Sequence, residues 1–300
     1  MSRLRPLLAC SVLLVAGEAA AQELDPRSYA PAPVGSAFVL LGAGKSEGGY
    51  VLDPAVDIDD VEADLVFSTT GAGYTFGLAG RQARVIAVVP AARGELTGET
   101  DAGPERVELD GLVDPRFKLS VGLLGAPAQT AQELARSPRR TVLGASLTVM
   151  PPWGQYDSRQ LVNLGYHRWA FKPEIGVSLP AGRFTLEGYA GVWLYTANRA
   201  YYPGRAVRRQ EPVVSLQGHV AYALPGRAWL ALDGTWFSGG RTEVDGVAND
   251  DRQENGRVGA TLSIPLRPFH SLKLAYSTAL HTRRGSDFST LSLTWQWVRL

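Results

Sequence analysis

The sequence has one cysteine, two methionines and almost no net charge. The 30 Lys and Arg against 29 Asp and Glu give a formal charge of +1, which leaves no basic surface of the kind that nucleic-acid-binding proteins need. The lone Cys10 excludes a disulfide framework and a thiolate metal site. No stretch reaches the about 18 consecutive apolar residues that a membrane-spanning helix requires. We therefore predict no nucleic-acid partner and no transmembrane helix.

Glycine is abundant, at 33 of 300 residues, and apolar residues make up 45% of the chain. This apolar content excludes global disorder. The excess of glycine indicates many tight turns between short elements.

The N-terminus has the pattern of a secretory signal. Arg3 and Arg5 precede an apolar run over residues 7–17, and small residues follow up to Ala21. We predict export with cleavage after Ala21. A lipoprotein site at Cys10 is the alternative, but the apolar run continues beyond it. The signal and the glycine-rich composition favour the envelope of a Gram-negative bacterium.

Apolar and polar residues alternate along much of the chain, which is typical of strands with two different faces. In residues 172–179, Ile175, Val177 and Leu179 alternate with Lys172 and Glu174. Similar segments recur along the whole chain. The predicted strands are residues 35–45, 60–77, 81–94, 114–125, 139–151, 169–180, 183–197, 211–225, 227–238, 255–266, 269–281 and 286–298.

The connections between these segments alternate between short and long. Short turns at residues 77–81, 180–183, 225–227 and 266–269 alternate with long polar segments at 46–59, 95–113, 152–168, 198–210 and 239–254. This rhythm is typical of a bacterial transmembrane barrel with short periplasmic turns and long outer loops. We predict an all-β fold, a transmembrane antiparallel up-and-down β-barrel of 12 strands. The connection at 126–138 is long for a turn, and we expect a short helix there.

Aromatic residues support this topology because they fall near the strand ends, where they form two girdles. The predicted outer girdle is Trp169, Phe171, Trp193, Tyr195, Trp236 and Phe237, and the inner one is Phe76, Phe184, Tyr222, Trp229, Phe269, Trp295 and Trp297. A soluble secreted β-sandwich is the alternative, but its strands are usually only about 5–6 residues long.

Several short motifs together resemble the bacterial outer-membrane transporter family named for the MetA-pathway of phenol degradation. The motifs are Asp114-Pro115-Arg116-Phe117, Gly154-Gln155-Tyr156-Asp157, Leu161-Val162-Asn163-Leu164-Gly165, Arg168-Trp169-Ala170-Phe171-Lys172-Pro173-Glu174, Gly239-Gly240-Arg241-Thr242, Val244-Asp245-Gly246, Asn249-Asp250-Asp251, Asn255 with Arg257-Val258-Gly259-Ala260-Thr261, and Asp287-Phe288. The resemblance implies an outer-membrane barrel that passes small, often aromatic or hydrophobic compounds. His167, Trp153 and the lack of a terminal aromatic at Leu300 depart from the family pattern.

Charged residues at the polar positions of the alternating strands are the candidate functional residues. A charge facing lipid near the midplane costs about 2–4 kcal/mol for Arg or Lys, so we expect these side chains to point inward. The candidate lumen-lining residues are Arg116, Lys118, Lys172, Glu174, Glu187, Asp233, Arg257 and Lys273, with Tyr189 and Trp193 as a stacking surface. Two interpretations stay open: the residues line a pore, or they pair across a packed interior.

Motifs for other chemistry are weak. The four histidines lack metal-ligand spacing, and no nucleophile elbow occurs. A barrel-embedded hydrolase would need His219 with Ser215, but we see no acidic partner for them. Asp245, Asn249, Asp250 and Asp251 could hold calcium, although a solvated loop is favoured. We expect no enzyme activity, no catalytic residue, no cofactor and no metal.

The sequence thus predicts a signal peptide at 1–21, a periplasmic or plug segment at 22–34, and a barrel at 35–300. The predicted function is passive passage of small organic compounds, including aromatic or hydrophobic ones, across the outer membrane. The expected partners of this monomer are outer-membrane lipid and lipopolysaccharide, the barrel insertion machinery and the permeant. A non-conducting structural or adhesive barrel is the alternative from another class.

Overall fold

The computed structural model describes residues 24–51, 58–101 and 103–300. The predicted signal peptide, its cleavage site after Ala21 and Cys10 lie outside these residues. In the described part of the chain, no helix has both the length and the apolar character needed to cross a membrane.

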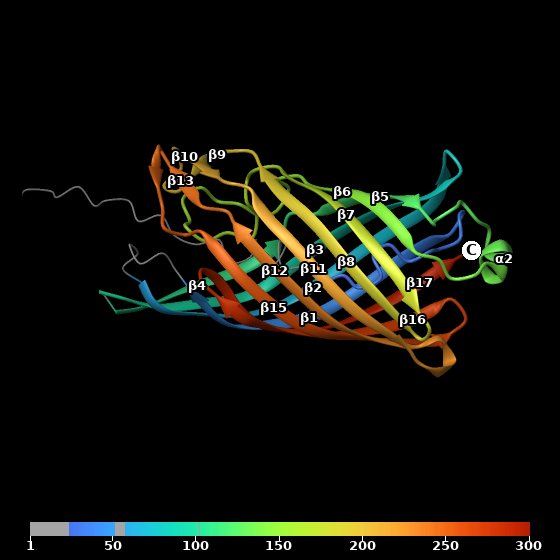
Figure 1. Cartoon of the computed structure of the whole chain (residues 1–300). Coiled ribbons are helices and arrows are strands. Elements are labelled where there is room, and N and C mark those ends of the chain that lie inside the picture. Colours follow the sequence, from blue (N-terminus) through green and yellow to red (C-terminus); the bar gives the residue numbers. More distant parts are fainter. Residues whose placement is uncertain (1–23, 52–57, 102) are drawn as a thin grey trace, which may run out of the picture.

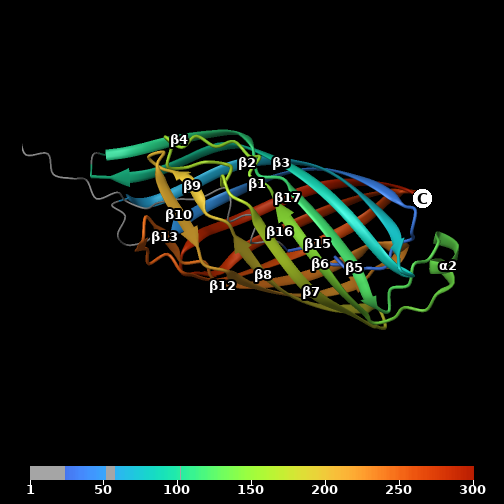
Figure 2. The same cartoon turned by 90° about the horizontal axis from the view of Figure 1, so that it is seen from above.

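Most of the described strands form one long antiparallel sheet that closes on itself (Figures 1 and 2). Each strand pairs with its neighbours in sequence, and β4 and β5 together occupy one position because both pair with β3. The strands are β1 (Ala37–Val51), β2 (Ile58–Leu78), β3 (Arg81–Thr100), β4 (Gly103–Leu112), β5 (Arg116–Leu124), β6 (Val142–Met150), β7 (Ala170–Ala181), β8 (Phe184–Tyr195), β11 (Val213–Ala223), β12 (Trp229–Gly239), β15 (Gln253–Arg267), β16 (His270–Thr282) and β17 (Gly285–Arg299).

The first strand closes the barrel. β1 pairs with β17 from Ala37 opposite Arg299 to Val51 opposite Gly285, and its other edge pairs with β2. Since β2 also pairs with β3, the barrel is closed, and among the described strands of the main sheet β4 is the one that pairs along a single edge. The predicted twelve-stranded up-and-down barrel is confirmed.

The two ends of the barrel differ. We call the end where β1 begins and β17 finishes the terminal end; it carries tight turns, the 3₁₀ turn η1 (Pro225–Arg227) and the helix α2 (Ala131–Arg136). Thr130 and Glu133 form a reciprocal capping box at the start of α2, which confirms the short helix expected within 126–138.

The opposite end, here the loop end, carries the longer connections. Two of them form a small separate sheet from β9 (Asn198–Tyr201), β10 (Ala206–Gln210), β13 (Thr242–Val244) and β14 (Val247–Ala248) (Figure 1). These two connections, at 198–210 and 239–254, are therefore partly ordered as strands.

Two of the predicted loops are wrong in the described residues. Segments 46–59 and 95–113 largely continue as strand, because β3 pairs with β4 from Ala91 opposite Leu112 to Thr100 opposite Gly103. β2 and β3 are 21 and 20 residues long, whereas a tilted span needs only about 9–11. Their loop-end halves, with β4, project beyond the rest of the wall (Figure 2). We call residues 58–70, 91–101 and 103–112 the β2–β4 extension.

The alternation sorts side chains between the two faces of the wall. Outward positions carry exposed apolar residues on every part of the barrel. Examples are Leu119, Leu147, Ile175, Leu186, Leu216, Leu232, Leu274 and Leu293. The inward positions between them carry buried polar residues, which is the arrangement expected of a barrel in lipid.

The outer aromatic girdle needs correction. Trp169 and Trp236 are exposed as predicted, but Trp193 and Phe237 are each only 1% exposed. They point inward and form a buried cluster with Met150, Ala170 and Val213. The cause is the alternation of side chains along each strand. Trp193 lies on the same face of β8 as Tyr189, and Phe237 lies on the same face of β12 as Asp233, so both point away from the lipid.

Close packing along the closure strand generates a test. Gly44 in β1 lies inward, and a Cβ there would meet the Phe67 ring and the Leu291 carbonyl. We expect Gly44→Val to overpack the wall at a cost of about 1–3 kcal/mol. Gel electrophoresis with increasing heating should show the compact band of the folded barrel converting at a lower temperature than in the wild type.

Gly218→Val is the matched control, since Gly218 in β11 faces outward with open space around it. It should leave the conversion temperature unchanged. Equal behaviour of the two variants would contradict the packing at β1.

Candidate functional site

The carboxylate of Glu174 is the centre of a buried network inside the barrel. Its Oε2 lies 2.7 Å from Lys172 Nζ on the same strand, and its Oε1 lies 3.5 Å from Lys118 Nζ on β5. Gln217 of β11 donates to Oε2 at 3.5 Å. Since Lys172 and Glu174 are 2% and 5% exposed, their charges are compensated by each other rather than by bulk water.

Glu187, another of the candidate lumen-lining residues, bonds to groups other than Lys172 and Glu174. Its carboxylate accepts hydrogen bonds from the Ser178 hydroxyl at 2.9 Å and from the backbone N–H of Arg27 at 2.6 Å. Arg27 precedes the barrel in sequence, so a segment of the chain outside the wall reaches into the interior.

Asp233 forms a second buried group with two neighbouring strands. Its Oδ1 lies 2.7 Å from His219 Nδ1, and its Oδ2 accepts a hydrogen bond from Thr261 at 2.7 Å. The expectation that His219 lacks an acidic partner is therefore wrong. Ser215 lies four residues from His219 on β11, about 13 Å along a strand. A hydrogen bond between Ser215 and His219 is out of reach, so these two residues do not belong to one catalytic triad.

The remaining charged candidates are spread around the barrel. Arg257 is buried, and its Nη2 donates to the Ser277 hydroxyl at 3.1 Å and to the Phe288 carbonyl at 2.8 Å. Arg116 in β5 and Lys273 in β16 are half-buried.

Tyr189 and Trp193 were expected to offer a stacking surface, and the structure places both in packed surroundings. The Tyr189 ring lies 5.2 Å from the Tyr29 ring and 5.0 Å from the His219 ring. Trp193 belongs to the apolar cluster described above, with Lys172 Nζ 5.7 Å from its ring centroid.

A loop over residues 151–169 folds into the loop end of the barrel and is held by Asp114. The Asp114 carboxylate accepts hydrogen bonds from the backbone N–H groups of Gly154 at 2.6 Å and Tyr166 at 2.8 Å. The Gln155 N–H donates to the Leu112 carbonyl at 2.8 Å. Asp114 sits in the gap between β4 and β5, so it anchors both ends of the loop to the wall.

Apolar side chains fasten the same loop to the β2–β4 extension. Val162 and Leu164 pack with Val61, Leu65 and Leu96 in one buried cluster. The loop therefore covers part of the barrel mouth.

Charged residues at the mouth are also held in place. The Arg168 guanidinium lies 4.3 Å from the Tyr195 ring centroid and bonds to Gln210. Burial lowers the pKa of Arg168 to about 10. Hydrogen bonds from Arg159 hold the pKa of the half-buried Asp157 carboxyl at about 2, so both Arg168 and Asp157 remain charged at neutral pH.

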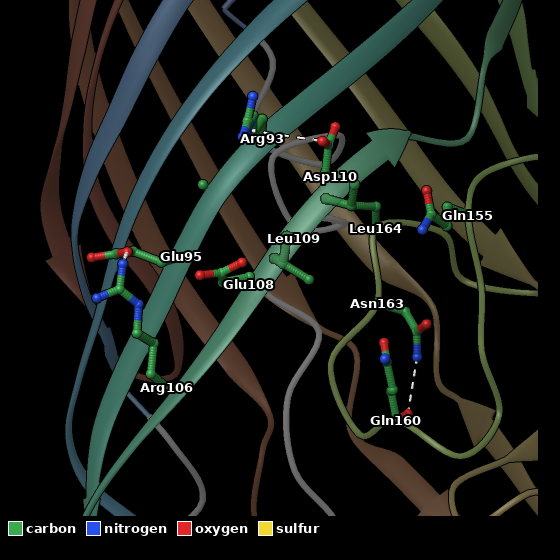
Figure 3. Close-up of a pocket in the computed structure, with 11 residues that line it drawn as sticks. Arg93, Glu95, Arg106, Glu108, Leu109, Asp110, Gln155, Gln160, Asn163 and Leu164 are labelled. Carbon is green, nitrogen blue, oxygen red and sulfur yellow. Dashed lines mark hydrogen bonds and ion pairs between the residues drawn. The ribbon is translucent and has the colours of Figure 1, made fainter.

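Two cavities lie between the loop and the β2–β4 extension. The first has a volume of about 470 Å³ and is lined by Glu95, Arg106 and Glu108 on the strands and by Gln160 and Asn163 on the loop (Figure 3). The second has a volume of about 400 Å³ and an apolar wall that includes Ile58, Leu96, Val107, Leu161 and Val162. Both fall in the size range of small-molecule sites.

The acidic residues considered for calcium take part in contacts within the loops. Asp245 accepts from the Val207 N–H and Asp251 from the Thr242 N–H, each at 2.7 Å. Asp250 lies 3.6 Å from both Arg283 and Arg284, and Asn249 donates to Thr242. In the residues that the structure describes, no three His, Cys, Asp or Glu side chains are placed to hold a metal.

Two residues with central positions were not among the sequence candidates. Tyr29 lies inside the barrel and bonds to Glu174, and Asp114 anchors the mouth loop. Asp114 stands in a motif that carries the family resemblance, so a signal existed. Tyr29 had none, because its segment shows no periodicity.

The closed twelve-stranded sheet, the apolar outer belt and the polar interior define a membrane-spanning β-barrel. The chain belongs to the family described as "Putative MetA-pathway of phenol degradation", which matches residues 42–295. The family resemblance is thereby confirmed.

The fold is similar to the COG4313 outer membrane channel from Pseudomonas putida F1, with a TM-score of 0.76 and 19% identity over 92% of this chain and 100% of that chain. It is also similar to the transport unit of the autotransporter AIDA-I from Escherichia coli, with a TM-score of 0.53 and 11% identity over 94% of each chain. No curated protein sequence matches this chain.

The role of Asp114 can be tested by proteolysis. Asp114→Ala removes the acceptor for the N–H groups of Gly154 and Tyr166. A hydrogen bond to a charged group contributes about 1.5–3 kcal/mol to stability. We expect trypsin to cut the folded protein after Arg159 at least about tenfold faster, because the freed loop opens more often.

Asp250→Ala is the matched control, since it removes an exposed acidic residue whose ion pairs are worth about 0–1 kcal/mol. It should leave cleavage after Arg159 unchanged. Unchanged cleavage in Asp114→Ala would show that the apolar contacts alone hold the loop.

Proposed function

We propose that this protein is an outer-membrane channel for the passive entry of small organic compounds, including aromatic or hydrophobic ones. Passage involves no chemical step and no cofactor. The similar barrel from Pseudomonas putida F1 is described as an outer membrane channel, and membership in the family supports the same class of function.

The observation that carries the proposal is the pair of cavities at the loop end. One wall is apolar and the adjoining one is charged, so a compound with an apolar body and a polar edge can contact both. The cavities lie beside the loop that Asp114 anchors, and this loop covers part of the barrel mouth. Entry therefore couples capture at the mouth to movement of that loop.

Below the mouth, the buried charge network sets selectivity. Lys118, Lys172 and Glu174 lie within one network, and Lys118 Nζ also lies 3.9 Å from the Asp25 carboxylate. A permeating molecule meets fixed charges of both signs, which discriminate by charge and by hydrogen bonding.

The location follows from the same features. The apolar belt requires lipid, and the predicted signal peptide provides export to a Gram-negative outer membrane with the loop end outside. Lipid and lipopolysaccharide surround the monomeric barrel, and the insertion machinery places it there.

A non-conducting structural barrel is the second candidate, and the packed interior favours it. The mouth loop, the apolar cluster around Trp193 and the network at Glu174 follow one another along the interior. Conductance separates the two candidates.

Reconstitution tests the channel directly. Liposomes containing the protein should swell in isosmotic 4-hydroxybenzoate but not in a tetrasaccharide, and planar bilayers should show current steps. Asp114→Ala should increase the swelling rate because the mouth loop opens. If neither the wild type nor Asp114→Ala gave swelling or current, although both were folded, the channel proposal would be rejected in favour of the non-conducting structural barrel.

Luminal charge can be tested through ion selectivity. Lys172→Ala removes the cation nearest to Glu174, so the interior should attract cations more strongly. The reversal potential in a salt gradient should shift towards the value for cation selectivity.

Lys45→Ala makes the same charge change on an exposed, outward position of β1, and should leave the reversal potential unaltered. A shift of equal size in both variants would mean that overall charge, and not the network, sets selectivity.

A further inference from the structure

Residues 24–36 lie inside the barrel and are bound to its wall by separate hydrogen bonds. The Gly35 N–H donates to the Thr75 carbonyl at 2.7 Å, and the Ala32 N–H donates to Gln82 Oε1 at 2.8 Å. Arg84 donates to the Ala30 carbonyl at 3.1 Å. Further hydrogen bonds join Arg27 to Glu187, Ser28 to Tyr189 and Lys118, and Val34 to Gln129. Gly35 and Ser36 continue the pairing of β1 with β2, whereas the contacts before them in sequence are separate bonds rather than a strand ladder.

Tyr29 is the most deeply held residue of this segment, at 5% exposure. Its ring lies against Gly144 of β6 and Gly176 of β7, which are opposite each other in the strand register. A Cβ at either glycine would collide with the ring. The two glycines therefore form a recess in the wall with the width of one aromatic ring.

The recess has polar groups placed for a phenol. The Tyr29 hydroxyl lies 3.0 Å from the Ser146 hydroxyl and donates to Glu174 Oε1 at 3.2 Å. The Tyr189 ring meets the Tyr29 ring edge to face, and Lys118 Nζ lies 5.7 Å from the ring centroid. The carboxylate only accepts hydrogen bonds, so it favours a ring that carries a neutral hydroxyl over a hydrocarbon or a phenolate.

We propose that this recess is a binding site for a phenolic compound inside the barrel, and that Tyr29 occupies it in the structure as an internal competitor. A phenol from outside and the 24–36 segment then exclude each other, so a bound phenol favours the state in which the segment has left the lumen. The inference rests on the proposed channel function for the route by which the phenol arrives.

Binding of p-cresol, which has the shape of the tyrosine side chain, tests the proposal by equilibrium dialysis with the same detergent on both sides. If Tyr29 fills the recess about nine-tenths of the time, Tyr29→Ala should bind p-cresol about tenfold more tightly than the wild type. Toluene, which lacks the hydroxyl, should bind Tyr29→Ala about tenfold more weakly than p-cresol does.

A second substitution shows whether binding is at the recess. The nearest atoms to a Cβ at Gly144 all belong to Tyr29, so Gly144→Val fits into the space that Tyr29→Ala vacates. This double variant should lose the tight p-cresol binding, whereas Tyr29→Ala with the outward-facing Gly218→Val should keep it. The compact band on unheated gels verifies that each variant is folded.

Equal p-cresol affinity in the wild type and Tyr29→Ala, or unchanged affinity in the Gly144→Val double variant, would overturn the proposal. Liposome swelling distinguishes failure of the phenol-site proposal from failure of the proposed channel function. Swelling without recess binding rejects only the phenol site, and recess binding without swelling rejects only the channel.

Discussion

In a bilayer, the backbone of this chain satisfies its hydrogen bonds only by pairing strand with strand until the sheet has no edge. The pairing of β1 with both β17 and β2 supplies that closure. Once the sheet is closed, every inward side chain shares one limited space. The alternation that puts leucine and valine towards lipid also puts lysine, glutamate and aspartate inside, where they must find partners.

The interior meets this requirement by pairing side chains from nearby strands, some of which lie two strands apart. Glu174 receives Lys172, Lys118 and Gln217, and Asp233 receives His219 and Thr261. Most of these partners come from different strands, so the pairs also bind the wall together. The His219–Asp233 contact resembles part of a catalytic triad, but Ser215 lies too far along the same strand to join it.

The two ends of the interior are filled by chain that is not part of the wall. Asp114 holds the 151–169 loop at one end, and Glu187 and Glu174 hold the 24–36 segment from the other. Separate hydrogen bonds hold most of the 24–36 segment, and hydrogen bonds with an apolar cluster hold the loop, whereas the wall is held by continuous ladders. In the proposed channel, these two elements are the ones that must move to open the path.

The sequence by itself determined the strands, their two faces, their number and the family, because a period of two and the rhythm of turns are local properties. The tertiary structure decided which luminal charges pair, since Lys118 and Glu174 are far apart in sequence and meet only through the strand order and register. It also decided that β2, β3 and β4 extend past the membrane, because polar residues form strands once a partner strand continues beside them. The positions of Tyr29 and of the glycines around it depend on closure, which brings a segment without periodicity against strands more than a hundred residues away.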